Sequence, residues 1–230
     1  MLIFLDVETT GLDVSDKIVS IGLVVVDEEI STEYSALVNE GKKIPPKASS
    51  IHHITNEMIK DKSLLRESEP YIFLESFNQT GVCLVGHNIN FDLKKLYDSV
   101  GFEWQGKMVD TLRVSKHLLP ESEEFSLQFL RYDLKLYRDE KEPIVIHDAL
   151  SDAKVVKSLY EYLLTLASDE ELQRLSFVNV LMQKFEFGKY AGRYIEEISM
   201  LDSSYLQWML NNIMDLDEDL RYSIKHYLQG

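Results

Sequence analysis

The chain has 230 residues, of which 45% are hydrophobic, and its formal net charge is −15 at pH 7. A hydrophobic fraction of this size can build a core and argues against an intrinsically disordered chain. The acidic excess argues against nonspecific nucleic-acid binding, although an enzyme that binds divalent cations adds carboxylates of its own.

Cysteine content and apolar runs indicate the expected cellular compartment. Cys83 is the only cysteine, so there is no disulfide framework, which fits a reducing compartment. The apolar run at residues 2–5 is too short for a signal peptide and lacks a basic flank. No apolar run approaches the length of a membrane span. We therefore expect a cytoplasmic protein of one or two domains that has no membrane partner.

Three strands are expected in the first 38 residues, because the segments are apolar or alternating and rich in β-branched side chains. Short links between them predict an antiparallel meander. The segment that follows, with Pro45 and Pro46, is expected to be a loop over residues 40–50. The three expected strands are residues 1–8, 16–27 and 31–38.

Helices and strands then alternate, which together with the meander predicts a mixed sheet covered by helices, an α/β fold. Apolar residues at three- and four-residue spacing indicate the helices, and short apolar runs indicate the strands. The helices are expected at residues 69–78 and 91–100 and within 147–167, and the strands at residues 81–88 and 107–111.

The stretch "FLDVETTGLD" at residues 4–13 places two acids inside an apolar run. Asp6 and Glu8 are two apart in a predicted strand, so both side chains point to one face while Val7 points to the core. Two adjacent carboxylates buried without a partner are unfavourable, so a basic side chain or a hard divalent cation is needed between them. The alternative is a strand end at which both acids are solvated.

Three more polar residues occupy settings that suit such a site. Asp92 follows "GHNINF" where a strand meets a helix, and Asp152 lies five residues after His147 in "HDALSDA". Five residues leave two helical side chains about 140° apart, so we expect His147 in the loop before the helix and Asp148 as its N-cap. Alternatively, Asp92 is a helix cap and His147 is a surface residue.

Together, "DVETTGL", "GHNINFD" and "HDALSD" resemble, in this order and spacing, the three motifs of the DEDDh 3′–5′ exonucleases. "IHHIT" and "VDT" are smaller similarities to the same family, which includes polymerase proofreading subunits, ribonuclease T and oligoribonuclease. The resemblance implies an exonuclease domain over residues 1–168. Its expected fold is ribonuclease-H-like, a five-stranded mixed sheet flanked by helices.

The resemblance also implies a metal-dependent reaction. It assigns Asp6, Glu8, Asp92 and Asp152 to two Mg²⁺ or Mn²⁺ ions, and His147 to the general base that activates a water molecule. The implied activity is that of a 3′–5′ exodeoxyribonuclease that releases nucleoside 5′-monophosphates, in DNA repair or end trimming.

Substrate contacts follow from the same resemblance. The backbone at Thr9 and Thr10 is expected to approach the terminal nucleotide, and Gly11 to permit a tight turn. Leu12 is expected to act as an apolar wedge against the last bases.

Other residues near the motifs have two readings each. Asn88 and Phe91 are expected to contact substrate, with turn formation and core packing as their alternatives, and the histidines of "IHHIT" are read as packed or solvated. Basic side chains could add phosphate contacts, which would give weak, salt-sensitive binding without sequence specificity, and the alternative is that they lie on solvated helix faces. These are Lys94, Lys95, Arg113, Lys116, Lys154 and Lys157.

Residues 169–230 are expected to form a small C-terminal module. "FEFGKYAGRY" predicts a tight turn between extended pieces, and "DSSYLQWMLNNI" a helix capped by Asp202. The pattern resembles the C-terminal extension of exodeoxyribonuclease X-like proteins, which favours DNA. The module either positions nucleic acid through Lys189 and Arg193, or packs as a mini-core through one helix face, which comprises Tyr205, Trp208, Met209 and Ile213.

Other functions stay open. An exoribonuclease would share these motifs, because none of them reads the 2′-hydroxyl. A proofreading subunit would use its C-terminal segment to bind a polymerase. An inactive scaffold is the non-enzyme alternative, against which the five intact catalytic positions argue. The expected partners are DNA with single-stranded 3′ ends or duplex DNA, with RNA and a second copy of the chain as alternatives.

Overall fold

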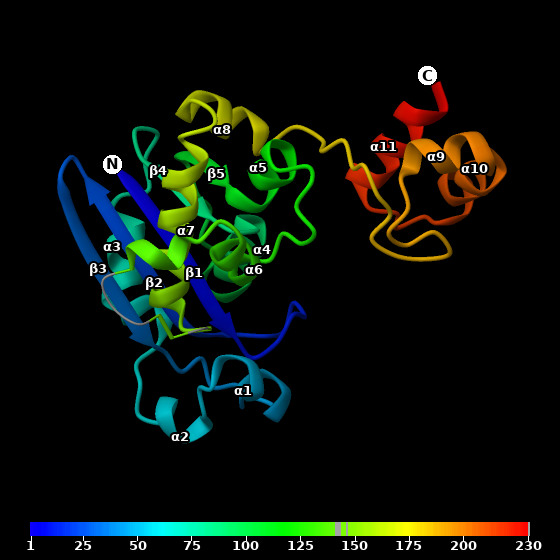
Figure 1. Cartoon of the computed structure of the whole chain (residues 1–230). Helices are drawn as coiled ribbons and strands as arrows, with labels where there is room; N and C mark the ends of the chain where they lie inside the picture. Colours follow the sequence, from blue (N-terminus) through cyan, green and yellow to red (C-terminus); the bar gives the residue numbers. More distant parts are fainter. Residues whose placement is uncertain (141–143, 146, 230) are drawn as a thin grey trace.

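A five-stranded mixed sheet forms the centre of the computed structural model, which describes residues 1–140, 144–145 and 147–229 (Figure 1). The strand order is β3-β2-β1-β4-β5. β1 pairs with β2 and β2 with β3 in antiparallel fashion, which confirms the meander, whereas β4 and β5 add in parallel. The strands are β1 (Leu2–Thr9), β2 (Ile18–Asp27), β3 (Ile30–Leu37), β4 (Cys83–Gly86) and β5 (Lys107–Asp110).

Helices cover both faces of this sheet. On one face, α3 and α4 enclose a buried cluster that includes Leu5, Leu74 and Leu96. On the other face, α5, α6 and α7 enclose a second cluster around Phe4 and Val156. The expected α/β architecture is therefore confirmed. The helices are α3 (Glu69–Ser76), α4 (Ile89–Val100), α5 (Thr111–Leu118), α6 (Leu127–Asp133) and α7 (Ala149–Leu163), and the 3₁₀ turn η2 (Leu136–Asp139) follows α6.

The segment expected to be a loop over residues 40–50 is irregular up to Pro45, but a helix begins at Pro46. Pro46 takes the first helical position, where its fixed φ is favourable and its missing N–H costs nothing. The helix forms a small lobe below the sheet in Figure 1, with a buried cluster that includes Val19, Ile44 and Ile54. The lobe contains α1 (Pro46–His52) and α2 (Asn56–Ile59), whereas the 3₁₀ turn η1 (Leu65–Glu67) packs Leu65 into the cluster beneath α3.

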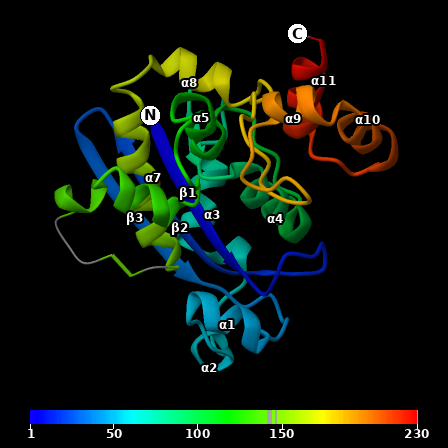
Figure 2. The same cartoon turned by 45° about the vertical axis from the view of Figure 1, so that its right-hand side comes forward.

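The C-terminal helices have a core of their own. α8 (Asp169–Leu175) still belongs to the first unit, because Leu172 and Leu175 pack into the cluster around α7. The separate cluster begins at Phe185 and joins three helices that stand beside the sheet in Figures 1 and 2. Packing thus places α8 with the first unit, although the motifs suggested a boundary at residue 168. The three helices are α9 (Ile195–Leu201), α10 (Ser203–Asn212) and α11 (Glu218–Gln229).

The expected turn and helix cap of this module are present. Lys184 and Tyr194 form an antiparallel bridge around the turn. Asp202 accepts the N–H of Tyr205 at 3.2 Å and caps α10. The expected buried face of α10 is confirmed in part, because Met209 is buried and Tyr205 and Ile213 pack against the core of the module. Trp208 is instead 51% exposed, and Leu206 is buried.

A partly buried ion pair connects the C-terminal helices to the first unit. Arg113 on α5 donates two hydrogen bonds of 3.0 Å to Asp219 on α11, and a third of 2.6 Å to the carbonyl of Val178. Asp219 also accepts the N–H of Val180 at 2.9 Å. Loss of one partner would leave a buried charge uncompensated, so this contact is expected to stabilise the join strongly.

Candidate active site

A pocket of about 450 Å³ opens at the carboxyl ends of β1 and β4, and all five residues predicted to be catalytic line it. Asn88 and Phe91 line it as well, whereas Thr9, Thr10, Gly11 and Leu12 follow directly along the chain without lining it. Within the described residues the lining contains no lysine or arginine. The lining residues are Asp6, Val7, Glu8, His87, Asn88, Phe91, Asp92, Ser126, Leu127, Gln128, His147 and Asp152.

β1 presents its two acids as the alternation predicts. Val7 is only 6% exposed, while Asp6 and Glu8 on either side of it face the pocket. Asp6 lies opposite Gly22 on β2. A Cβ on Gly22 would come within 2.3 Å of the backbone of Ala149, so the glycine lets the start of α7 approach the sheet closely.

Asp92 joins α4 to β1. Its Oδ1 accepts the N–H of Val7 at 3.0 Å, and its side chain is nearly fully buried. The alternative that Asp92 is the helix cap is excluded, because the N-cap of α4 is Asn88 with a left-handed φ of 66°. Asp92 lies instead in the first turn and faces the pocket.

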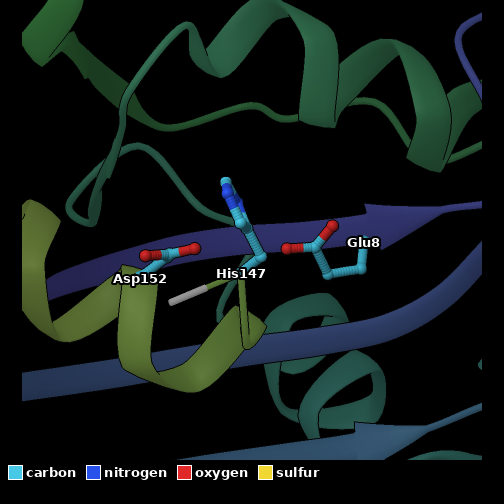
Figure 3. A group of neighbouring side chains, drawn as sticks. All are labelled: Glu8, His147 and Asp152. Atoms are coloured by element: carbon cyan, nitrogen blue, oxygen red, sulfur yellow. The ribbon is translucent and has the colours of Figure 1, made fainter. Parts of the chain in front are cut away.

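His147 and Asp152 meet Glu8 across the pocket (Figure 3). One ligand atom of each of these three side chains lies within 4.8 Å of the other two. His147 precedes α7 with a left-handed φ of 59°, and Asp148 caps the helix by accepting the N–H of Ser151 at 3.0 Å. The expected placement of the histidine in the loop and of Asp152 in the first turn is therefore confirmed.

Sequence reasoning missed the residue that orients Asp152. The amide of Gln128 on α6 donates to Oδ1 of Asp152 at 2.7 Å. Arg131 in turn donates to the side-chain oxygen Oε1 of Gln128 at 3.1 Å, and pairs with Glu140 through two bonds of 2.6 Å. No motif marks this segment, because a glutamine acquires this function only through a tertiary contact.

A second residue that supports the pocket lies in the "VDT" segment. The buried carboxylate of Asp110 accepts the N–H groups of Asn88 and Leu112, both at 3.0 Å. His87 is held by Thr111 and by the carbonyl of Phe125, at 3.0 and 2.7 Å. Burial lowers the pKa of His87 to about 4, so this imidazole is neutral at physiological pH.

The four carboxyl groups of the pocket all have raised pKa values, with burial as the main cause for each. The pKa of Glu8 rises to about 8 and that of Asp152 to about 6. The pKa of Asp6 lies well above its usual range, because burial is reinforced by the charges of Asp92 and Asp152. Burial likewise raises the pKa of Asp92. Carboxylate oxygens crowded in this way beside an imidazole fit a hard divalent cation, which would compensate their charge.

Residues 9–12, which were expected to contact the substrate, differ in their exposure. Thr9 and Thr10 are buried, and Leu12 is 81% exposed. The hydroxyl of Thr9 donates to the carbonyl of Gly11 at 2.8 Å. A Cβ on Gly11 would come within 2.5 Å of Asp16, so close packing, rather than the turn alone, requires glycine here.

The basic side chains near the pocket are largely engaged elsewhere. Lys95 is 1% exposed and donates to the carbonyl of Asp13, and Arg113 binds Asp219 as described above. Lys94 is exposed. The other basic side chains form ion pairs, most of them partly exposed, which would have to open for a phosphate contact. These pairs are Lys116–Glu186, Lys154–Glu33, Lys157–Glu161, Lys189–Asp202 and Arg193–Glu197.

The histidines of "IHHIT" differ in their surroundings. His52 is buried, and its Nδ1 accepts the N–H of Ile54 at 3.0 Å. Burial lowers the pKa of His52 below its ordinary value. His53 is exposed and ends α1 with a left-handed φ of 60°. The two are therefore packed and solvated, respectively, as expected.

Two family models match the chain. Residues 3–160 match the exonuclease family, and residues 185–214 match the exodeoxyribonuclease X-like C-terminal family. The second match covers the turn and most of α10, where the sequence had suggested the same resemblance. Among the described residues, no helix is long and apolar enough to cross a bilayer.

Individual relatives agree with these matches. Exodeoxyribonuclease 10 of Escherichia coli (strain K12) is 30% identical over 233 residues, which cover 100% of both chains. The PolC-type DNA polymerase III of Thermotoga petrophila is 31% identical over 193 residues, which cover 80% of this chain and 13% of the polymerase.

Solved structures are similar as well. A structure described as exonuclease X in complex with 5′ overhanging duplex DNA has a TM-score of 0.61 at 26% identity, covering 76% of this chain and 99% of that one. Escherichia coli exonuclease I in complex with a dT13 oligonucleotide has a TM-score of 0.55 at 19% identity, over 72% of this chain and 41% of that one. This second likeness shows the fold alone, and with the first it confirms the expected ribonuclease-H-like sheet.

Proposed function

Because the chain belongs to the exonuclease family, we propose that it is a metal-dependent 3′–5′ exodeoxyribonuclease that releases nucleoside 5′-monophosphates. Its physiological role would be in DNA repair or end trimming. The observation that carries this proposal is the convergence of four carboxyl groups and an exposed histidine, from three separate chain segments, on one pocket.

We assign roles to the pocket residues accordingly. Asp6, Glu8, Asp92 and Asp152 would hold two Mg²⁺ or Mn²⁺ ions. Divalent cations bound there supply a lowered pKa for the attacking water and stabilise the negative charge that develops on the leaving oxygen. His147 accepts the proton of that water as its oxygen bonds to phosphorus and the bond from phosphorus to the 3′-oxygen breaks. The shortened strand keeps a 3′-hydroxyl.

DNA is the substrate that the similarities favour. The full-length relative is named an exodeoxyribonuclease, and the C-terminal match is to the same type. We propose that Thr9, Thr10 and Gly11 contact the terminal nucleotide through their backbone and that Leu12 packs against its base. Asn88 and Phe91, which line the pocket, complete the contacts.

For the C-terminal module we propose a bracing function. Its connection to α5 includes the partly buried Arg113–Asp219 ion pair, while Lys189 and Arg193 pair with Asp202 and Glu197. These contacts support a structural role for the module, in preference to a role in which Lys189 and Arg193 bind phosphates.

The proposal is tested with 5′-labelled single-stranded DNA, duplex DNA and RNA of one sequence, in Mg²⁺ or Mn²⁺. We expect a ladder that shortens from the 3′ end, is lost in Asp152→Asn and persists in Asp61→Asn, a matched change at a side chain that is 86% exposed. Fastest cleavage of RNA would replace the exodeoxyribonuclease with an exoribonuclease. If the folded protein cleaved no strand with metal present, the enzymatic proposal would be wrong.

A further inference from the structure

Asp152, a pocket carboxylate on α7, is held in place by a residue of α6. Its side chain is buried, and its Oδ1 accepts an N–H of the Gln128 side-chain amide at 2.7 Å. Gln128 is itself partly buried and lines the pocket. A donor on one carboxylate oxygen restricts how the group can turn, which matters for a group that is to bind a hard cation.

The orientation of the Gln128 amide decides whether it can hold Asp152, because an amide has a donor side and an acceptor side. Arg131, about one turn further along α6, donates from its Nη1 to Oε1 of Gln128 at 3.1 Å. An arginine can only donate, so the amide oxygen faces Arg131 and the amide nitrogen faces Asp152. The opposite orientation would place the amide oxygen against a carboxylate and the NH₂ group against the guanidinium. Arg131 therefore selects the orientation in which Gln128 holds Asp152.

Arg131 is held in turn by a carboxylate. Both oxygens of Glu140, which follows η2, accept hydrogen bonds from its Nε and Nη2 at 2.6 Å each. Arg131 is buried, and its guanidinium carbon lies 5.1 Å from the ring centre of Tyr132. A two-bond pair of this kind fixes the plane of the guanidinium, which an ammonium group cannot do. A chain of hydrogen bonds therefore runs from Glu140 through Arg131 and Gln128 to Asp152.

This chain of hydrogen bonds reaches further than helix packing requires. The Arg131–Glu140 pair alone would join α6 to the segment after η2. The link through Gln128 ends instead on Asp152, whose carboxylate lies with Glu8 and His147 in a group of ligand atoms within 4.8 Å of one another. Partners that hydrogen-bond metal ligands orient them, and loss of such a partner typically weakens metal binding by about 10–100-fold.

We propose that Gln128 and Arg131 are positioning residues for a divalent cation. Arg131 orients the Gln128 amide, that amide holds the Asp152 carboxylate facing the pocket, and Glu140 keeps Arg131 in place. The inference rests on the proposed metal-dependent function. It adds three residues that lie outside the motifs of the exonuclease family.

The test is calorimetric binding of Mn²⁺ to the full chain without DNA. We expect Gln128→Met, which keeps the length of the side chain but removes its donor, to weaken Mn²⁺ binding by about tenfold or more. Arg131→Lys should weaken it by a similar factor, because an ammonium keeps the charge but does not select the amide orientation. Since Arg131 acts through Gln128, the double variant should bind Mn²⁺ within about twofold of Gln128→Met. In DNA cleavage assays, a higher Mn²⁺ concentration should recover most of the rate that each variant loses.

Matched variants separate positioning from general damage. On α8, Gln173 donates to Asp169 at 2.5 Å, so Gln173→Met removes the same kind of bond outside the pocket lining. Arg113→Lys weakens another two-bond pair outside the lining, and it should lower the melting temperature. Both should bind Mn²⁺ as wild type does. Gln128→Met should stay folded, because Arg131 keeps its pair with Glu140, and the melting temperature without metal verifies this.

Each outcome decides between explanations. Wild-type Mn²⁺ affinity in folded Gln128→Met would overturn the inference. Losses that multiply in the double variant would overturn it as well, because Arg131 would then act independently of Gln128. If wild type bound Mn²⁺ and cleaved DNA while the variants matched it, only the positioning would be wrong. If wild type neither bound Mn²⁺ nor cleaved DNA, the proposed function would fail first, and the positioning with it.

Discussion

Removal of one negative charge from the pocket should stabilise the metal-free protein. Burial, together with the charges of Asp152 and Asp92, raises the pKa of Glu8 from 4.5 to about 8. A carboxyl group with a raised pKa binds more protons in the folded state than in the unfolded state, so its contribution to stability falls as the pH rises from about 4.5 to about 8. Glu8→Gln keeps the shape of the side chain and avoids this loss.

The magnitude follows from the pKa. A rise of the Glu8 pKa from 4.5 to about 8 means that its ionised form destabilises the folded protein by at most about 5 kcal/mol at alkaline pH. The pocket is open to water and Glu8 is partly exposed, so solvent screening reduces this to about 2 kcal/mol. In a chain of this size that free energy raises Tm by about 4–8 °C at pH 8. At pH 5 the gain should shrink to about 1 °C.

Thermal unfolding in a chelating buffer at pH 5 and pH 8 measures the effect. Glu103→Gln, an exposed glutamate just before β5 and away from the pocket, is the matched control and should change neither value. Addition of Mn²⁺ at pH 8 should stabilise wild type more than Glu8→Gln, because the variant loses one ligand. If the metal-free Tm of Glu8→Gln at pH 8 were at or below that of wild type, or if the gain were equal at both pH values, ionised Glu8 would not destabilise the pocket.

Three other variants test separate parts of the structure. His147→Gln should slow DNA hydrolysis by about 10²–10⁴-fold, measured in single-turnover assays, while a thermal shift with Mn²⁺ persists. Arg113→Met should lower the free energy of unfolding by about 3 kcal/mol in urea titrations, because the Asp219 carboxylate, which is 8% exposed, is left without its cation; a loss below about 1 kcal/mol would contradict this stabilising role. Gly22→Ala should weaken Mn²⁺ binding in calorimetry, because its Cβ would displace the backbone at Ala149; unchanged affinity would argue against this close approach.

Local patterns predicted the centre of the fold, and the resemblance to the exonuclease motifs implied the five pocket residues. Alternation along β1 places Asp6 and Glu8 on one face whatever the strand packs against, because side chains alternate in any strand. The N-cap at Asp148 also depends only on nearby residues. Such features can be read from short stretches, and the structure confirms them.

Features that depend on distant contacts could not be predicted in this way. Gln128 orients Asp152 from a segment without a motif, and Trp208 is exposed because the neighbours of α10 determine which face is buried. Pairing of Arg113 with Asp219 spans 106 positions. Pro46 was misleading for a local reason, since proline marks loops and helix starts alike.

The most direct test of the central claim is the fate of the water oxygen. The protein would digest a DNA strand with Mg²⁺ in water labelled with a heavy oxygen isotope, and mass spectrometry would analyse the released products. The account predicts mononucleotides that leave from the 3′ end with the label in their 5′-phosphate, and a shortened strand that ends in an unlabelled 3′-hydroxyl. Release from the 5′ end, or products that carry a 3′-phosphate, would contradict it.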